Sequence, residues 1–132
     1  MLDEIHQQQF FECKGGCLTG SAAHCAEPAK TAHLFMVQSL LSTYKDVVHI
    51  LLVIRISANE RHDVLKRVIM SLESAGLHVV AVITDNNAIN RKMMSLFCNG
   101  KEPDIVYPHP ANSQQPLFYV VDTVHLLKCR AK

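Results

Sequence analysis

The chain has 132 residues, the size of one ordinary domain. Its residues are 48% hydrophobic, and 13 basic side chains oppose 12 acidic ones, which excludes a disordered tail and a uniformly basic nucleic-acid-binding protein. There is no signal-peptide pattern, no apolar run of about 18 residues and no regular frame among the five cysteines, so we expect an intracellular protein with reduced thiols and no membrane contact.

The first third of the chain favours strands. Residues 1–20 predict two short strands joined at the Gly15-Gly16 pair, because glycine supplies the positive φ of a tight hairpin. Residues 21–30 are small and polar and predict a loop. Two further apolar runs predict strands over 32–41 and 47–57, although the first of them could begin as a helix.

Two helices are predicted in the middle of the chain, on either side of a strand. Residues 58–76 carry apolar side chains at helical spacing, with Asn59 as the expected cap at the start and Gly76 at the end. An apolar strand follows over 79–84. A second helix then places one apolar face in the core and ends near Asn99-Gly100; its core residues are Ile89, Met93, Leu96 and Phe97.

The last part of the chain predicts a long loop over 101–116, a strand over 117–121 and the start of a helix from 123. The complete order is a β-rich third followed by alternating helices and strands. This order predicts an α/β protein in which a mixed sheet with flanking helices has an RNase H-like layout, as a single domain over residues 1–132.

Three aspartates occupy strands or strand ends: Asp3 lies in the first strand, Asp85 ends the central strand and Asp122 ends the last. Carboxylates that project from rigid strands can hold divalent ions for phosphoryl chemistry, and hard Mg²⁺ prefers oxygen ligands. Two plainer interpretations stay open. Asp85 or Asn86 could simply cap the next helix, and Asp3 could be an ordinary residue near the chain end.

Five short segments, taken in order, resemble the RNase H-like catalytic domain of P-element-type DNA transposases, the relatives of THAP-domain transposases. The segments are "MLDEIH" (1–6), "KGGCLTG" (14–20), "AHLFMVQSLLSTYK" (32–45), "VITDNNAINRK" (82–92) and "VDTVHLLK" (121–128). The parent reaction of that family is metal-assisted cleavage and transfer of DNA strands. The resemblance therefore implies a nuclear location and, for the parent protein, DNA at transposon ends as the partner. Tight DNA binding by this chain alone is not expected, because the sequence has no basic excess.

The resemblance also implies roles for individual residues. Asp3 and Asp85 match the first two metal-binding, catalytic carboxylates, which would hold Mg²⁺ or Mn²⁺. Further residues match family positions of unassigned, possible supporting role: Asn90, Arg91, Asp122, His125 and Lys128.

Some parts of the family pattern have no counterpart in this sequence. The sequence has no match to three parts of the family: the third catalytic carboxylate, the GTP-binding insertion and the zinc-dependent DNA-binding domain. We therefore expect a fold that is incomplete at the C-terminus. Homo-oligomers and GTP binding are expected of the full-length family. Metal binding should then be weak. The alternative function is a catalytically inactive, transposase-derived domain that acts as a binding module.

Cysteine, histidine and basic residues elsewhere in the chain offer further hypotheses. A zinc site at Cys13, Cys17, His24 and Cys25 has irregular spacing, and no feature brings a histidine to a cysteine as the base of a thiol nucleophile. Basic residues could follow a DNA backbone or simply be solvated; they are the "NRK" segment (90–92), Lys14, Lys45, Arg55, Arg61, Arg67 and Lys128.

Overall fold

The computed structural model describes residues 2–6, 12–14, 17–19, 27–99 and 105–123, and for the first three segments it describes the backbone. The chain divides into two compact units, Leu2–Ile56 and Ser57–Lys132. In the described parts no helix is long and apolar enough to cross a membrane.

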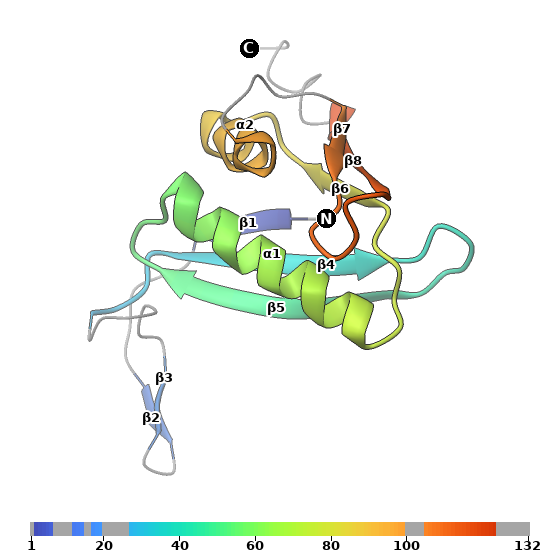
Figure 1. Ribbon diagram of the computed structural model, residues 1–132. Coiled ribbons are helices and arrows are strands. Elements are labelled where there is room, and N and C mark those ends of the chain that lie inside the picture. Colours follow the sequence, from blue (N-terminus) through green and yellow to red (C-terminus); the bar gives the residue numbers. More distant parts are fainter. Residues whose placement is uncertain (1, 7–11, 15–16, 20–26, 100–104, 124–132) are drawn as a thin grey trace. The chain divides into compact units, whose positions relative to one another are not determined.

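An antiparallel sheet dominates the first unit (Figure 1). Its strands are β1 (Leu2–His6), β4 (Thr31–Gln38) and β5 (Lys45–Val53), in the order β1-β4-β5. Two short strands, β2 (Glu12–Lys14) and β3 (Cys17–Thr19), pair antiparallel on either side of the glycine pair and confirm the predicted hairpin.

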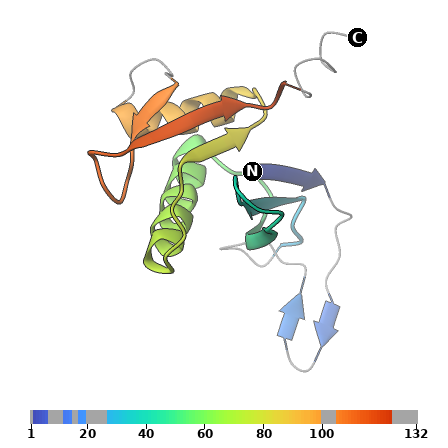
Figure 2. The same ribbon diagram turned by 90° about the vertical axis from the view of Figure 1, so that its right-hand side faces the viewer.

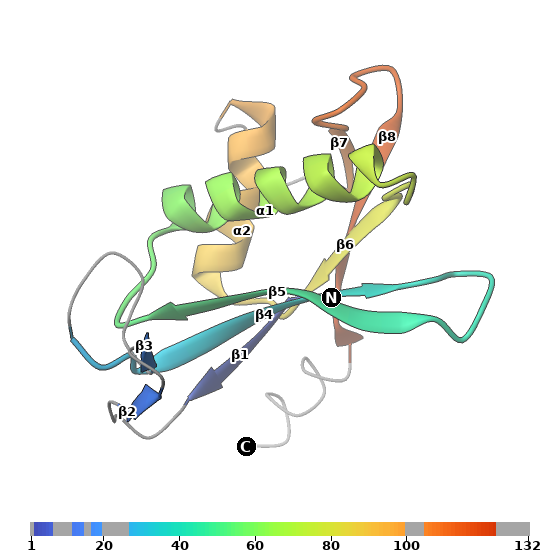
Figure 3. The same ribbon diagram turned by 90° about the horizontal axis from the view of Figure 1, so that it is seen from below.

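The connection between β4 and β5 differs from its prediction (Figure 3). The apolar run continues to Leu41, but the strand ends at Gln38 because the Ser39 hydroxyl accepts hydrogen bonds from the backbone N–H groups of Leu41 and Ser42. Leu40 and Leu41 are consequently exposed at the hairpin tip. The alternative of a helical start was wrong, since the segment is extended from Thr31 onward.

The second unit begins with helix α1 (Ala58–Ser74). Its N-cap is Ser57 and not the predicted Asn59, because Ser57 and Glu60 form a reciprocal capping box. The predicted end is confirmed: Gly76 has a φ of 84° and continues the chain in a left-handed conformation.

A second sheet has the order β6-β8-β7 (Figure 2). The strands β6 (Ala81–Thr84) and β8 (Pro116–Val121) are parallel, whereas β7 (Val106–Pro108) runs antiparallel to β8. The prediction of a continuous loop over 101–116 was therefore wrong. Tyr107 is buried in β7, but a strand of three residues that ends in proline is too short to show an apolar period.

Helix α2 (Ala88–Ser95) continues into a short 3₁₀ helix, η1 (Leu96–Cys98), and ends at the left-handed Asn99, as predicted. Its buried face differs from the prediction, because Ile89 is exposed while Asn90 and Met94 are buried beside Met93. The rings of His62 in α1 and Phe97 in η1 also pack edge to face, with their centroids 4.3 Å apart.

Candidate functional site

Asp85 and Asp122 follow two strands that run side by side. In the parallel pair of β6 and β8, Thr84 lies opposite Val121, so the next residue of each strand is an aspartate. The Asp122 backbone N–H donates to the Thr84 carbonyl at 2.8 Å and extends the pairing by one step. Both aspartates thus stand at one carboxyl edge of the sheet, where open α/β sheets bind their ligands.

The Asp85 carboxylate is held by one of its two oxygens. Its Oδ1 accepts from the Asn90 Nδ2 at 2.5 Å and, more weakly, from the Asn87 backbone N–H at 3.4 Å. Within the part of the chain that the structure describes, no group donates to Oδ2. The carboxylate is half-buried, so it combines a fixed orientation with one oxygen available to a ligand.

The capping interpretation of Asp85 was wrong, as was that of Asn86. Asn87 is the N-cap of α2, and its side chain accepts from the Asn90 backbone N–H at 2.8 Å. Asn86 instead accepts from Arg91, whose Nη1 lies 2.7 Å from the Asn86 carbonyl and 3.0 Å from its Oδ1. Because another residue caps the helix, the Asp85 side chain is not committed to that role.

Arg61, in helix α1, contacts the Asn90 side chain that holds Asp85. Its position differs from the sequence prediction. Both predicted roles, a contact with DNA and a solvated surface residue, are wrong, because the side chain is buried, with 1% of the residue exposed. Its Nη1 donates to the Asn90 Oδ1 at 2.5 Å. A signal was present in the sequence, because Arg61 precedes Val64 and Leu65 by three and four residues and shares their helix face.

The remaining predicted site residues are placed less completely. Asp3 lies in β1, where its backbone pairs with Leu34 of β4, and its role beside Asp85 stays a prediction. His125 and Lys128 lie outside the described residues. Among the residues that are described, no group of three or more His, Cys, Asp or Glu side chains could hold a metal ion.

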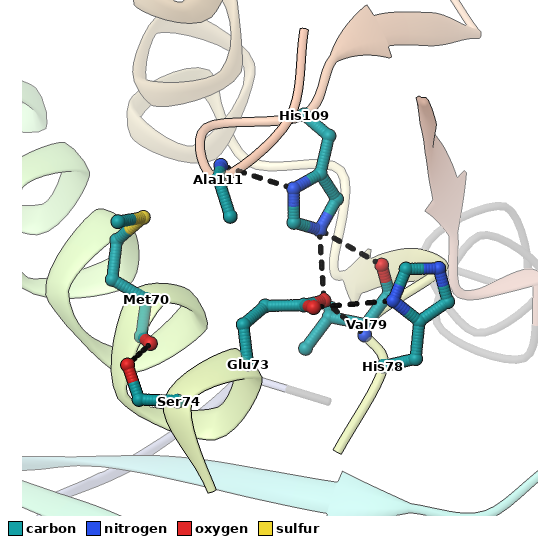
Figure 4. Close-up of polar contacts among 7 residues, drawn as sticks. All are labelled: Met70, Glu73, Ser74, His78, Val79, His109 and Ala111. Atoms are coloured by element: carbon teal, nitrogen blue, oxygen red, sulfur yellow. Dashed lines mark hydrogen bonds and ion pairs between the residues drawn. The ribbon is translucent and has the colours of Figure 1, made fainter. Parts of the chain in front are cut away.

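A second polar cluster joins three segments of the same unit (Figure 4). Glu73 accepts from the Val79 backbone N–H at 2.7 Å, and its oxygens lie 3.1 Å from the His78 Nδ1 and 3.2 Å from the His109 Nε2. The hydrogen bond from Val79, followed by that from His78, lowers the pKa of Glu73 below its ordinary value of 4.5.

The tautomer of His109 follows from its neighbours. The Ala111 backbone N–H donates to Nδ1, so Nδ1 accepts and the proton of the neutral ring lies on Nε2. That proton faces the Val79 carbonyl, 3.0 Å away, as well as Glu73. The cluster therefore fastens the end of α1 to the connection before β6 and to the loop between β7 and β8.

Comparisons with known proteins cover most of the chain. Residues 5–98 match the model of the family described as "TNP-like, RNase H N-terminal domain". A solved structure, "Drosophila P element transposase strand transfer complex", is similar with a TM-score of 0.77 and 23% sequence identity. The similarity covers 98% of this chain and 27% of that one. No match was found among curated proteins.

Proposed function

The chain belongs to the family of TNP-like RNase H N-terminal domains, and from this premise we propose that it serves a DNA transposase whose reaction is metal-assisted strand cleavage and transfer. The family match and the similarity in fold confirm the predicted P-element-type, RNase H-like domain. The chain spans 27% of the length of the similar transposase chain, so the reaction, the partners and the domain extent of 1–132 remain proposals.

The observation that carries the proposal is the hydrogen bonding of the Asp85 carboxylate. One oxygen is fixed by Asn90, and no described residue donates to the other. A carboxylate oxygen of this kind fits a hard divalent cation such as Mg²⁺ or Mn²⁺. Asp3 is proposed as the second ligand, and Asp122, from the neighbouring strand, as a support for the site.

The roles of the protein residues follow from their positions. A divalent ion, when bound, supplies charge stabilisation at a phosphodiester. Asp85 would hold it from the end of β6, and Asn90 would keep the carboxylate in a single orientation. The predicted support from Arg91 is not part of this proposal, since its guanidinium is exposed and binds Asn86.

The proposed partner is DNA at transposon ends, and the proposed location is the nucleus. Exposed basic side chains for phosphate contacts include Arg55 and Lys92. GTP and homo-oligomerisation are proposed for the full-length transposase and not for this chain.

Thermal unfolding in millimolar Mg²⁺ or Mn²⁺ tests the metal site. A ligand that binds only the folded state raises the midpoint by mass action, so the wild-type midpoint should rise and the rise should vanish in Asp85→Asn and in Asp3→Asn. Asp63→Asn removes an exposed carboxylate from α1 and should leave the rise intact. Equal rises in all four proteins would indicate a general salt effect and contradict the proposal.

A nuclease and strand-transfer assay separates the two candidate functions. Turnover that depends on Mg²⁺ or Mn²⁺ and is abolished by Asp85→Asn supports an enzyme. Metal binding at Asp85 without turnover supports the catalytically inactive binding module. Absence of both metal binding and turnover would contradict the metal-dependent function of this chain.

A further inference from the structure

A buried arginine is an unusual component of a helix face that is otherwise apolar. Arg61 is 1% exposed and lies in α1 on the face of Val64 and Leu65. Removing a guanidinium from water is costly unless it is hydrogen-bonded inside the protein. One of its partners is Asn90 in α2, so this arginine connects the two helices through a side chain that also contacts Asp85.

The arginine determines how the Asn90 amide is oriented. An asparagine side chain has one accepting end, Oδ1, and one donating end, Nδ2. The guanidinium of Arg61 can only donate, so it requires Oδ1, and Nδ2 must then face the Asp85 carboxylate. The reversed amide would place a donor against a donor at Arg61 and an acceptor against an acceptor at Asp85.

Without the arginine, the energy difference between the two orientations of the Asn90 amide would be smaller. The Asn90 backbone N–H still binds the Asn87 cap, so the helix start does not depend on Arg61. The amide of Asn90, however, would lose the contact that fixes its Oδ1. The Asp85 carboxylate would then lose part of the restraint on its own rotation.

We propose that Arg61 is a positioning residue for Asp85, acting through Asn90 so that Asp85 presents Oδ2 to a divalent cation. Groups that support a metal ligand through hydrogen bonds commonly change metal affinity by about 10-fold to 100-fold when they are removed. The part of this inference that concerns metal rests on the proposed function. The orientation of the amide does not, and it can be measured without metal.

The metal-free test follows the side-chain amide protons of Asn90 by NMR. In the wild type they should exchange with water more slowly than those of the exposed Asn59. Arg61→Met should bring the exchange of Asn90 towards that of Asn59 while the backbone amides of α2 keep their wild-type protection. Arg67→Met, which changes an exposed arginine on the same helix, should alter neither.

The second test is Mn²⁺ binding to the same variants. Arg61→Met should weaken binding by about 10-fold, and Arg61→Lys, which keeps a donor, should restore part of the loss. Wild-type affinity in Arg61→Met would overturn the role in metal binding. If Asp85→Asn also bound Mn²⁺ like the wild type, the proposed function would fail, and the amide measurement would still decide the positioning role.

Two outcomes would overturn the positioning role itself. One is an unchanged exchange of the Asn90 side-chain amide in Arg61→Met. The other is a loss of protection shared by all backbone amides of α2, which would indicate a general loosening of the helix. If Arg61→Met does not fold, the test is made on the wild type. There the Arg61 Nη protons should exchange slowly and the Asn90 Nδ2 protons should lie close to Asp85. Failure of either result would overturn the positioning role.

Discussion

Two buried hydroxyl groups lie directly beside the carboxyl edge of β6 and β8. The Thr84 Oγ1 is 2.8 Å from the Asp85 carbonyl and 2.9 Å from the Tyr119 hydroxyl. Threonine has a single hydroxyl proton, which it donates to the Asp85 carbonyl, so Tyr119 donates to Thr84. Both residues are buried, with 1% of Thr84 and 8% of Tyr119 exposed.

This chain of hydrogen bonds predicts unequal costs for removing its two members. Thr84→Val keeps the shape but leaves the Tyr119 hydroxyl without that acceptor and the Asp85 carbonyl without that donor, at a cost of about 2 kcal/mol in unfolding free energy. Tyr119→Phe removes one donor while Thr84 keeps its bond to Asp85, so it should cost about 1 kcal/mol. The double variant should lose about 2 kcal/mol, because its second substitution removes a hydroxyl that has already lost its partner.

Urea unfolding of the wild type, both single variants and the double variant measures this coupling. Tyr44→Phe, at an exposed tyrosine in the other unit, is the matched control and should add no coupling with Thr84→Val. Additive single effects, with coupling below about 0.3 kcal/mol, would refute a stabilising hydrogen bond between the Thr84 and Tyr119 hydroxyls.

Two further predictions concern α1. Ser57→Ala removes the hydroxyl of the capping box and should lower the unfolding free energy by about 1 kcal/mol in a urea titration, whereas Asn59→Ala, at the wrongly predicted cap, should change it by less than about 0.5 kcal/mol. The bonds from Val79 and His78 lower the pKa of Glu73 below 4.5, so its carboxylate stabilises the fold above pH 4.5 and loses that effect as pH falls through the lower, folded-state pKa. Glu73→Gln should therefore be less stable than the wild type near pH 7, and the gap in urea midpoint should shrink below pH 4.5; a constant gap would contradict this assignment.

The elements that sequence patterns predicted best are those with long apolar periods. The α1 face extends over several turns, and Gly76 marks its end through a backbone conformation that glycine favours. Short elements carry less information. The strand β7 has three residues, and the choice between Ser57 and Asn59 as a cap depends on whether Glu60 can fold back onto the chain.

The sequence predicted the strand-end positions of Asp85 and Asp122 but not the residues that contact Asp85. Asp85 and Asp122 stand at strand ends because apolar runs stop there, and this is visible in the sequence. The link from Arg61 to Asp85 joins residues that are far apart in the chain through Asn90. Only tertiary packing shows that this arginine is buried, since charge alone favours the surface.

The most direct test of the central claim is paramagnetic broadening by Mn²⁺ in the NMR spectrum of the wild-type chain. A shared site predicts that substoichiometric Mn²⁺ broadens the backbone amide signals of Asp3 and Asp85 together, with Asp122 also affected. In Asp85→Asn this broadening should be lost at the same Mn²⁺ concentration. Broadening confined to Asp85, or centred on acidic residues elsewhere in the chain, would contradict a metal site formed by Asp3 and Asp85.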